Sequence, residues 1–377
     1  MHQTRQTGWN AADQSPRGGR MNGVLGPRQD LEDLFEPRPP KPAPPGQTTS
    51  RVMIMLMALV LVVTGAVTAV QLARSTSAVQ HLGDPFAPIP AAERLTVAPA
   101  AAQAMNVLVI GSDSRDSEGD TDDWTRGGQR SDVLAVMHLS ADRTNAQVVS
   151  IPRDSWVPVP GYGTTKVNAA YSYGGAPLAV HTVEQLTGLR IDHVVAIDFT
   201  GFARITDALG GVDICVPVTT TDGIGTVPAG CSTMTGDQAL SYVRQRKTLP
   251  GGDFDRMHHQ QNWMRAVLQG VADKGLLQDP ARAASVVSTV AAWVRTDDGL
   301  SDTQLLSLAW DLRTLGREDV TFLTAPLADP ATGMEGSASV VYLDQAAGAQ
   351  LWASLKDDDA AAWLAQNPDA ALADTVR

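Results

Sequence analysis

Residues 106–156 read NVLVIGSDSRDSEGDTDDWTRGGQRSDVLAVMHLSADRTNAQVVSIPRDSW, and this stretch decides the fold. It contains three short apolar runs, at Val107–Gly111, Asp132–Leu139 and Gln147–Ile151, each rich in β-branched residues and bounded by polar or turn-forming residues. Such runs are typical of buried β-strands. Because the link at 140–145 is short and rich in turn-forming residues, we expect the three strands to form an antiparallel meander.

A meander of this kind places chemically active side chains at one edge of the sheet. The end of the first strand, the start of the second and the end of the third meet there. The side chains at that edge would be Asp113, Arg130, Asp132, Arg153 and Asp154. Mg²⁺ takes one or two carboxylates together with substrate phosphate oxygens, and arginine holds phosphate through two donors. The sequence therefore predicts a site for a divalent cation and a phosphate.

The composition limits the classes of function. A chain of 377 residues that is 43% hydrophobic is long enough for one large domain, or two modest ones, and a tail. The net charge of -12 argues against a general nucleic-acid binder, because such proteins present a basic surface to phosphates. An anionic ligand must therefore be held by a local group of arginines, and we expect no nucleic-acid partner.

The N-terminal part predicts a membrane anchor. Residues 1–51 are rich in proline, glycine and polar residues without an apolar period, so we expect a disordered cytoplasmic tail. Residues 52–73 begin with VMIMLMALVLVVTGAVTAV, which is uncharged and long enough for one transmembrane helix. Basic residues before this span predict a cytoplasmic N-terminus and an extracytoplasmic domain. A cleaved signal peptide is the alternative, but a leader of this length is unusual for one.

The two cysteines, Cys215 and Cys231, lie in the part expected to be exported. An oxidising compartment favours a disulfide between them, worth about 3 kcal/mol by the chain-entropy estimate. No Cys-x-x-Cys motif supports redox catalysis, and thiols this far apart without a nearby histidine are poor zinc ligands.

The remaining segments predict a layered α/β domain at 105–345, after a linker at 74–104 and before a helical or frayed tail at 346–377. Strands and helices alternate along it, so we expect an α/β/α arrangement around a central mixed, largely antiparallel sheet. The expected elements are a loop at 157–165, helices at 166–171, 178–186, 199–209, 236–246, 280–294 and 301–315, and strands at 193–198, 212–216, 320–325 and 339–343.

A second group of charged residues follows the helix at 236–246. Side chains two apart on a helix face different ways, so Arg244 and Arg246 can converge on one ligand only if the helix ends between them. The Pro-Gly-Gly run at 250–252 supports such an end. The next helix carries Asp253, Arg256 and Gln260 at positions i, i+3 and i+7, which share one face.

Several long motifs resemble those of the LytR-CpsA-Psr family. They are NVLVIGSDSR, RSD at 130–132, SIPRDSW, KVNAAYSYGG, DFTGFARITDALGGVDICV and GDQALSYVRQRKTLPGGDFDRMHHQQ, in the family's order. The resemblance covers residue 106 to about residue 271. It implies a membrane-anchored enzyme that moves an anionic glycopolymer, such as teichoic acid or arabinogalactan, from a polyprenyl-pyrophosphate carrier to peptidoglycan through a phosphodiester.

The resemblance also implies roles for individual residues. Asp113 and Asp132 match the carboxylates that bind Mg²⁺, with Mn²⁺ as an alternative. Asp253 matches an acid that orients the arginines. The residues that match pyrophosphate-binding positions are Arg130, Arg153, Lys166, Arg244, Arg246, Arg256 and Gln260; among these, Arg153, Arg244 and Arg246 are expected, with Asp132, to carry catalysis. An acidic insertion at 116–123 departs from the family pattern.

Two other classes of function stay open at this stage. The same site, with water as the nucleophile, would make a polyprenyl-pyrophosphate pyrophosphatase. A non-catalytic lipid-binding or regulatory wall protein is the second alternative. For the prenyl chain we expect an apolar groove lined by the helices at 199–209 and 263–271.

Overall fold

The computed structural model describes residues 80–96, 101–112, 131–222, 225–247, 249–273, 275, 288–300, 304–305, 307–308, 312 and 315–373. The predicted tail at 1–51 and the predicted span at 52–73 lie outside these residues, as do Asp113, Arg130 and most of the helices expected at 280–294 and 301–315. Within the described part of the chain, no helix is both long and apolar enough to cross a bilayer.

The central sheet has the strand order β1-β12-β7-β2-β3-β4-β13 in the described residues. Its strands are β1 (Gln80–His81), β12 (Val294–Thr296), β7 (His193–Asp198), β2 (Met105–Ser112), β3 (Ser131–Leu139), β4 (Ala146–Ser150) and β13 (Val320–Thr324). β2, β3 and β4 form the predicted antiparallel meander, while β7 joins β2, and β13 joins β4, in parallel. The sheet is therefore mixed, and the longest ladder, between β2 and β3, is antiparallel.

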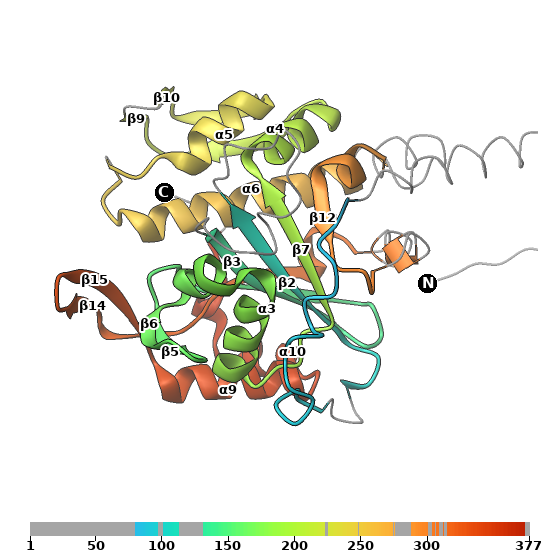
Figure 1. The fold of residues 1–377 in the computed structure, drawn as a ribbon. Coiled ribbons are helices and arrows are strands. Elements are labelled where there is room, and N and C mark those ends of the chain that lie inside the picture. The colour runs from blue at the N-terminus through green and yellow to red at the C-terminus, as the bar shows by residue number, and fades with distance from the viewer. Residues whose placement is uncertain are drawn as a thin grey trace, which may run out of the picture. The chain divides into compact units, whose positions relative to one another are not determined.

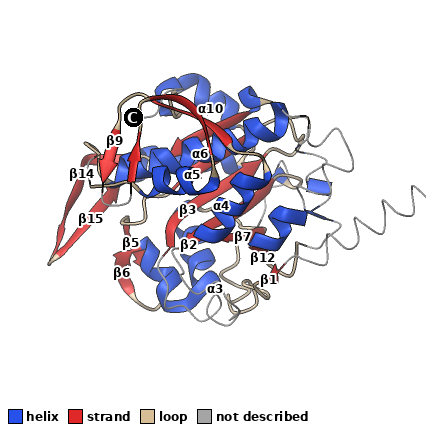
Figure 2. Cartoon of the chain, turned by 90° about the horizontal axis from the view of Figure 1, so that it is seen from above, coloured by secondary structure: helices blue, strands red, loops and turns tan. Residues whose placement is uncertain are grey.

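Helices cover both faces of this sheet (Figure 1). α3 (Val167–Thr187), α9 (Gln345–Lys356) and α10 (Ala360–Gln366) lie on one face, and α4 (Phe199–Ala208), α5 (Gly236–Arg244) and α6 (Asp253–Asp273) lie on the other. The side chains of each strand therefore alternate between these two layers of helices, because successive side chains of a strand point to opposite faces. Leu134 and Val136 belong to the core under α3 and α9, whereas Ala135 lies in the cluster with Met264 of α6. The view from above shows α4, α5 and α6 over the strands (Figure 2).

Four two-stranded antiparallel sheets complete the described strands. They pair β5 (Trp156–Val159) with β6 (Gly163–Lys166), β8 (Val212–Val216) with β11 (Gly230–Met234), β9 (Thr220–Asp222) with β10 (Gly225–Val227), and β14 (Leu327–Glu335) with β15 (Ala338–Leu343). With these included, antiparallel pairing predominates, and the predicted layered α/β class is confirmed.

The prediction of a loop at 157–165 is wrong, because this segment forms the β5–β6 hairpin. Proline and glycine suggested a loop, but Gly161 and Gly163 adopt positive φ angles of 79° and 71° and make the turn. Val157 and Val159 of β5 are buried in the main core. The alternation of buried and exposed side chains in β5 is the strand signal that the prolines obscured.

Two predicted breaks in helices are confirmed. α3 has a kink, with non-helical backbone at Gly174 and Gly175. α5 ends at Arg244, because Gln245 has the extended angles φ -60° and ψ 139°. Arg246 therefore leaves the helix and can point elsewhere than Arg244.

Part of the segment predicted as a linker packs against the domain. Leu82 and Ile89 are buried in the main core, and Nη1 of Arg94 lies 3.0 Å from Oε1 of the buried Glu184. The C-terminal helices also join this core, through Leu351 and Leu355 of α9. Both ends of the described chain therefore contribute to one hydrophobic core.

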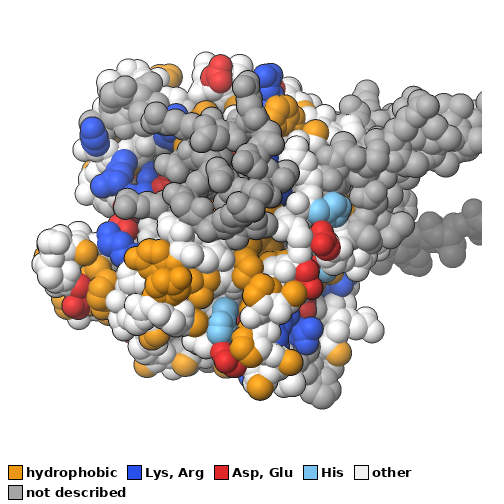
Figure 3. All heavy atoms as spheres, viewed as in Figure 1, with side chains coloured by type: hydrophobic (Ala, Val, Ile, Leu, Met, Phe, Trp, Pro, Cys, Tyr) orange, Lys and Arg blue, Asp and Glu red, His pale blue; other side chains and the backbone are white. Residues whose placement is uncertain are grey.

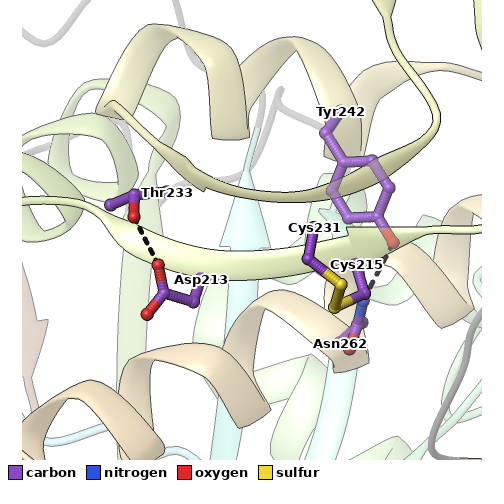
Figure 4. The surroundings of a disulfide bond; sticks show 6 residues. All are labelled: Asp213, Cys215, Cys231, Thr233, Tyr242 and Asn262. Atoms are coloured by element: carbon purple, nitrogen blue, oxygen red, sulfur yellow. Dashed lines mark hydrogen bonds between the residues drawn. A yellow bond between two sulfur atoms is a disulfide. The ribbon is translucent and has the colours of Figure 1, made fainter.

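The predicted disulfide joins Cys215 of β8 to Cys231 of β11 (Figure 4). The two residues are direct partners in the antiparallel register, so the bond ties one strand to the next. Beside it, Thr233 donates to Asp213 across the same pair, and the hydroxyl of Tyr242 accepts from Asn262 at 3.1 Å. This β8–β11 ribbon supplies Val212, Ile214 and Met234 to a second core with α4, α5 and α6.

The double variant Cys215→Ser, Cys231→Ser should be less stable than the native chain. We expect the free energy of unfolding to fall by about 3 kcal/mol, because the bond closes a 16-residue separation and restricts the unfolded chain. Denaturant titration of the variant measures the change. Reduction of the native protein should give the same shift, and an unchanged midpoint in both would show that the bond does not restrict the unfolded chain.

Candidate functional site

A cavity of about 280 Å³ lies where the predicted charged edge of the sheet meets the start of α6. The start of β3, the end of β4, the loop before α6, and β14 and β15 all contribute to it. Its charged and amide-bearing lining residues are Asp132, Arg153, Asp154, Arg246, Asp253, Arg256 and Gln260. The structure thus gathers most of the predicted site residues around one space.

Arg153 lies between two carboxylates from distant parts of the chain. Its Nη1 donates to Oδ1 of Asp132, at the start of β3. On the other side, Nε and Nη2 donate to the two oxygens of Asp253 at 3.2 and 3.1 Å. A guanidinium group that binds carboxylates on two sides has a fixed orientation, because its donors form a rigid planar fork.

Two further arginines share these carboxylates. Nη2 of Arg256 lies 2.9 Å from Oδ1 of Asp253, and its Nη1 lies 3.7 Å from Oδ1 of Asp132. Nε of Arg246 lies 3.8 Å from Oδ1 of Asp253. Asp253 therefore contacts three guanidinium groups. The role predicted for it, orienting the arginines, agrees with this geometry.

Electrostatics distinguish two of these arginines. Burial opposes the charge on Arg153, but the carboxylates of Asp253, Asp132 and Asp154 outweigh it and raise the pKa of Arg153. Burial lowers the pKa of Arg256, and the charge of Arg153 adds to that effect. Both stay protonated at physiological pH, because arginine titrates far above it. Nε of Arg256 is buried without a hydrogen-bond partner among the described residues, so this cation is the less compensated of the two.

The other predicted residues lie at different distances from the cavity. Nζ of Lys166 lies 3.0 Å from Oδ1 of Asp154, which lines the cavity, so Lys166 lies at its edge. Gln260 lines the cavity directly. Arg244 does not: its guanidinium lies over the ring of Phe199, 4.9 Å from the centroid. The end of α5 separates it from Arg246, and the predicted convergence of the two is not seen.

The fit to a metal ion rests on Asp132. Within the described residues there is no group of three or more His, Cys, Asp or Glu side chains arranged to hold a metal ion. Mg²⁺ needs fewer protein ligands than that, since it commonly binds one or two carboxylates and completes its shell with water and phosphate oxygens. Asp132 lines the cavity and uses Oδ1 for its arginine contacts, which leaves Oδ2 as one such ligand.

Part of the cavity wall comes from residues that sequence analysis did not associate with the site. Thr332 of β14 and Ser339, Val340 and Val341 of β15 line it. Val341 forms a parallel bridge with Ser155, directly after the Arg153-Asp154 pair. No local sequence pattern predicts this contact, because it joins segments almost two hundred residues apart. A strand at 339–343 was predicted, but not its position beside the site.

Two aromatic side chains of α4 and α6, the helices expected to line an apolar groove, pack against each other. The rings of Phe202 and Trp263 stack with centroids 3.8 Å apart, and Nε1 of Trp263 donates to the hydroxyl of Thr206 at 2.9 Å. Phe202 and Trp263 are both buried in the second core. Between these two rings, the described structure has packing rather than a groove.

Comparison with known sequences settles the family. The profile of the LytR_cpsA_psr family matches residues 67–357, which include the whole charged cavity. The chain belongs to this family. A relative named cell wall biosynthesis protein LcpA, from Corynebacterium glutamicum, is 33% identical over 284 residues, 65% of this chain and 54% of LcpA. The polyisoprenyl-teichoic acid–peptidoglycan teichoic acid transferase TagU of Bacillus cereus is 37% identical over 175 residues, 46% of this chain and 53% of TagU.

Solved LytR-CpsA-Psr structures share the fold. The LytR-Csp2A-Psr enzyme from Actinomyces oris superposes with a TM-score of 0.57 at 24% identity, over 70% of this chain and 93% of that one. A structure of TagT bound to LIIa-WTA gives a TM-score of 0.56 at 24% identity, over 72% and 98% of the two chains. At this identity the likeness concerns the fold alone. The chain spans little more than half the length of LcpA and about three fifths of LcpB, also from C. glutamicum.

Proposed function

We propose that this LytR-CpsA-Psr protein is a membrane-anchored phosphotransferase that moves an anionic glycopolymer from a polyprenyl-pyrophosphate carrier to peptidoglycan. The observation that carries the proposal is the contact of Asp253 with Arg153, Arg246 and Arg256 beside one cavity. Oriented guanidinium groups around a small space suit a pyrophosphate, whose oxygens accept paired hydrogen bonds. The names of the relatives LcpA and TagU, which refer to wall biosynthesis and to transfer onto peptidoglycan, support the same reading.

The charge of the cavity explains why a cation would help. The lining contains three arginines and three aspartates, so their formal charges cancel. A pyrophosphate entering a neutral cavity gains less than one entering a positive cavity. Mg²⁺ held by Asp132, with Asp113 as the predicted second ligand, would give the cavity a net positive charge and neutralise the phosphate oxygens during transfer. Mn²⁺ would serve the same purpose.

The proposed reaction is a displacement at phosphorus. A sugar hydroxyl of peptidoglycan attacks the phosphorus attached to the glycan, the bond to the bridging oxygen breaks, and polyprenyl phosphate leaves. Such reactions depend on positioning and charge neutralisation. Arg153 and Arg256 would hold the pyrophosphate oxygens, with Gln260 and Arg246 beside them. Lys166 and Arg130 would also bind the pyrophosphate.

The proton of the attacking hydroxyl needs an acceptor. Both oxygens of Asp253 are engaged, one with Nε of Arg153 and the other with Nη2 of Arg153 and Nη2 of Arg256. A carboxylate used in this way positions its partners. Asp253 is therefore assigned a supporting role, and of the two candidate bases, Asp113 and Asp253, we propose that Asp113 accepts this proton.

The location of the protein follows from the N-terminal sequence. We propose a single-pass membrane protein with residues 1–51 in the cytoplasm, an anchor at 52–73 and an extracytoplasmic domain. This arrangement brings the cavity to the side of the membrane where peptidoglycan is made, and the disulfide fits an oxidising compartment. The polymer would be a teichoic acid, an arabinogalactan or another secondary wall polymer.

Transfer by the purified full-length protein tests the proposal. In detergent with Mg²⁺, a labelled glycan on a polyprenyl-pyrophosphate carrier should become attached to a peptidoglycan oligomer, since the cavity would bind the carrier and orient the reacting phosphorus. Electrophoresis of the labelled product measures the transfer. A chelator should reduce it to background, and added Mg²⁺ should restore it.

The same experiment separates the alternatives. Release of the glycan phosphate at the same rate with and without acceptor would make the protein a pyrophosphatase. Binding of the carrier without any turnover would make it a lipid-binding or regulatory protein. Either result contradicts the transferase proposal.

A further inference from the structure

Two exposed tyrosines lie together on the surface near the charged cavity. Tyr162 is 55% exposed and Tyr173 is 48% exposed, although large apolar side chains in this part of the chain are mostly buried. Their rings stack on each other, with centroids 4.7 Å apart and planes 22° apart. Neither residue lines the cavity. An exposed pair of aromatic rings in a fixed arrangement is unusual and is typical of a surface that binds a ligand.

Glycines with unusual backbone angles lie next to both tyrosines. Tyr162 lies at the tip of the β5–β6 hairpin, between Gly161 and Gly163, whose positive φ angles only glycine adopts without strain. Tyr173 is followed by the non-helical Gly174 and Gly175 in α3. Both tyrosines thus lie beside positions where the chain departs from regular structure.

The pair is connected to the cavity by short pieces of backbone. β6 runs from the hairpin tip to Lys166, whose ammonium group binds Asp154 of the cavity wall. Four residues of strand span about 13 Å. The backbone N–H of Asn168, near the start of α3, donates to the carbonyl oxygen of Arg153 at 3.1 Å. From Asn168 to Tyr173 the helix rises by about 7.5 Å. The tyrosines are therefore within the length of a short oligosaccharide from Arg153.

The surface over β6 and the start of α3 agrees with this placement of the two tyrosines. Hydrophobic side chains gather over β6 and the start of α3, and Lys or Arg and Asp or Glu side chains lie directly beside them (Figure 3). Charged side chains thus border a hydrophobic surface on the same face.

We propose that Tyr162 and Tyr173 form a platform for a sugar ring of the peptidoglycan glycan strand, the acceptor in the reaction proposed above. A pyranose ring has an apolar face of C–H groups, which pack well against the electron-rich face of an aromatic ring. The acceptor is a polymer and cannot enter a cavity of about 280 Å³, so it must lie on the surface and present one hydroxyl to the cavity. The carrier-bound donor, by contrast, begins at the pyrophosphate among the arginines.

The inference rests on the proposed function, but binding can be measured without transfer. The probe is the N-acetylglucosamine tetramer, which has the same N-acetylated pyranose rings as peptidoglycan. We expect the full-length protein to bind it in a calorimetric titration. Tyr162→Ala and Tyr173→Ala should each weaken binding roughly three- to tenfold, the size of one aromatic contact. The phenylalanine variants at both positions should bind like the native protein, because the ring provides the contact.

A kinetic measurement assigns the platform to the acceptor. Each alanine variant should raise KM for a soluble glycan-strand acceptor by roughly the same three- to tenfold factor, with KM for the carrier-linked donor changed by less than about twofold. Val218→Ala is the matched control, because Val218 is 63% exposed and lies apart from the tyrosines, after β8. It should change neither constant. Melting temperatures check that all variants are folded.

The outcomes separate the platform from the transferase proposal. Native transfer with unchanged acceptor KM in both alanine variants would overturn the platform and leave the function standing. A raised KM for the donor alone would also overturn it, because the rings would then hold the carrier's glycan. Tyrosine-dependent binding of the tetramer by a protein that transfers nothing would support the platform as a glycan site and contradict the transferase proposal.

Discussion

Arg153→Ala should lower the rate of glycan transfer by about 10²–10³-fold, the usual effect of removing one group that stabilises a transition state. Arg153 binds Asp132 through one nitrogen and Asp253 through two, so it fixes both carboxylates of the cavity. Its loss removes a cation from the pyrophosphate site. Asp253 then keeps its contacts with Arg256 and Arg246. The initial rate of transfer, with saturating donor and acceptor, measures the effect.

A lysine at position 153 should not restore the rate. Its ammonium group is a point charge on a flexible stem and cannot reproduce a planar fork between two carboxylates. Arg190→Ala is the control, because Arg190 precedes β7 at the end of the sheet away from the cavity and its side chain makes a long contact of 3.8 Å with Asp192. The control should transfer at the native rate. Native activity in Arg153→Ala would remove this arginine from the site.

Asp132→Asn should have the second largest effect, again at least about a hundredfold loss of kcat. The substitution keeps the size of the side chain but removes the charge that would hold Mg²⁺. It also leaves the cavity lining with one more positive than negative side chain. Without Mg²⁺, we therefore expect the variant to bind the donor at least as tightly as the native protein does, while transfer and its response to Mg²⁺ are lost.

Kinetics and binding must be measured together for this variant. Titration of Mg²⁺ into the transfer assay gives the metal response, and filtration with labelled donor gives its affinity. Asp237→Asn serves as the control, because Asp237 is exposed in the first turn of α5 and does not line the cavity. A native response to Mg²⁺ in Asp132→Asn would show that Asp132 does not hold the cation. Weaker donor binding than that of the native protein, with both measured without Mg²⁺, would contradict the charge argument.

The central part of the fold could be predicted because its signals are local. The meander of β2, β3 and β4 follows from three apolar runs and a short link, and the register brings Asp132 and Arg153 to one edge. The helical spacing of Asp253, Arg256 and Gln260 placed them on one face, and all three line the cavity. Periodicity is a property of neighbouring residues, so it can be read before the chain folds.

Other features could not be predicted in this way. Glycine and proline in 157–165 suit a loop and a tight hairpin equally, and the burial of Val157 and Val159 in the core decides for the hairpin. Arg244 looked equivalent to Arg246, but the end of α5 directs it to Phe199. The segment at 80–96 looked like a linker, yet Leu82 and Ile89 find a place in the core.

The sequence by itself determined the family, the strands of the meander and the residue types of the site, because each depends on short motifs or on local periodicity. Only the tertiary structure decided which charges share a cavity. The contact of Arg153 with Asp253 spans a hundred residues, and the bridge of Ser155 with Val341 brings β15 to the same wall. Such contacts depend on how helices and strands pack across the sheet, and packing joins residues that no local pattern relates.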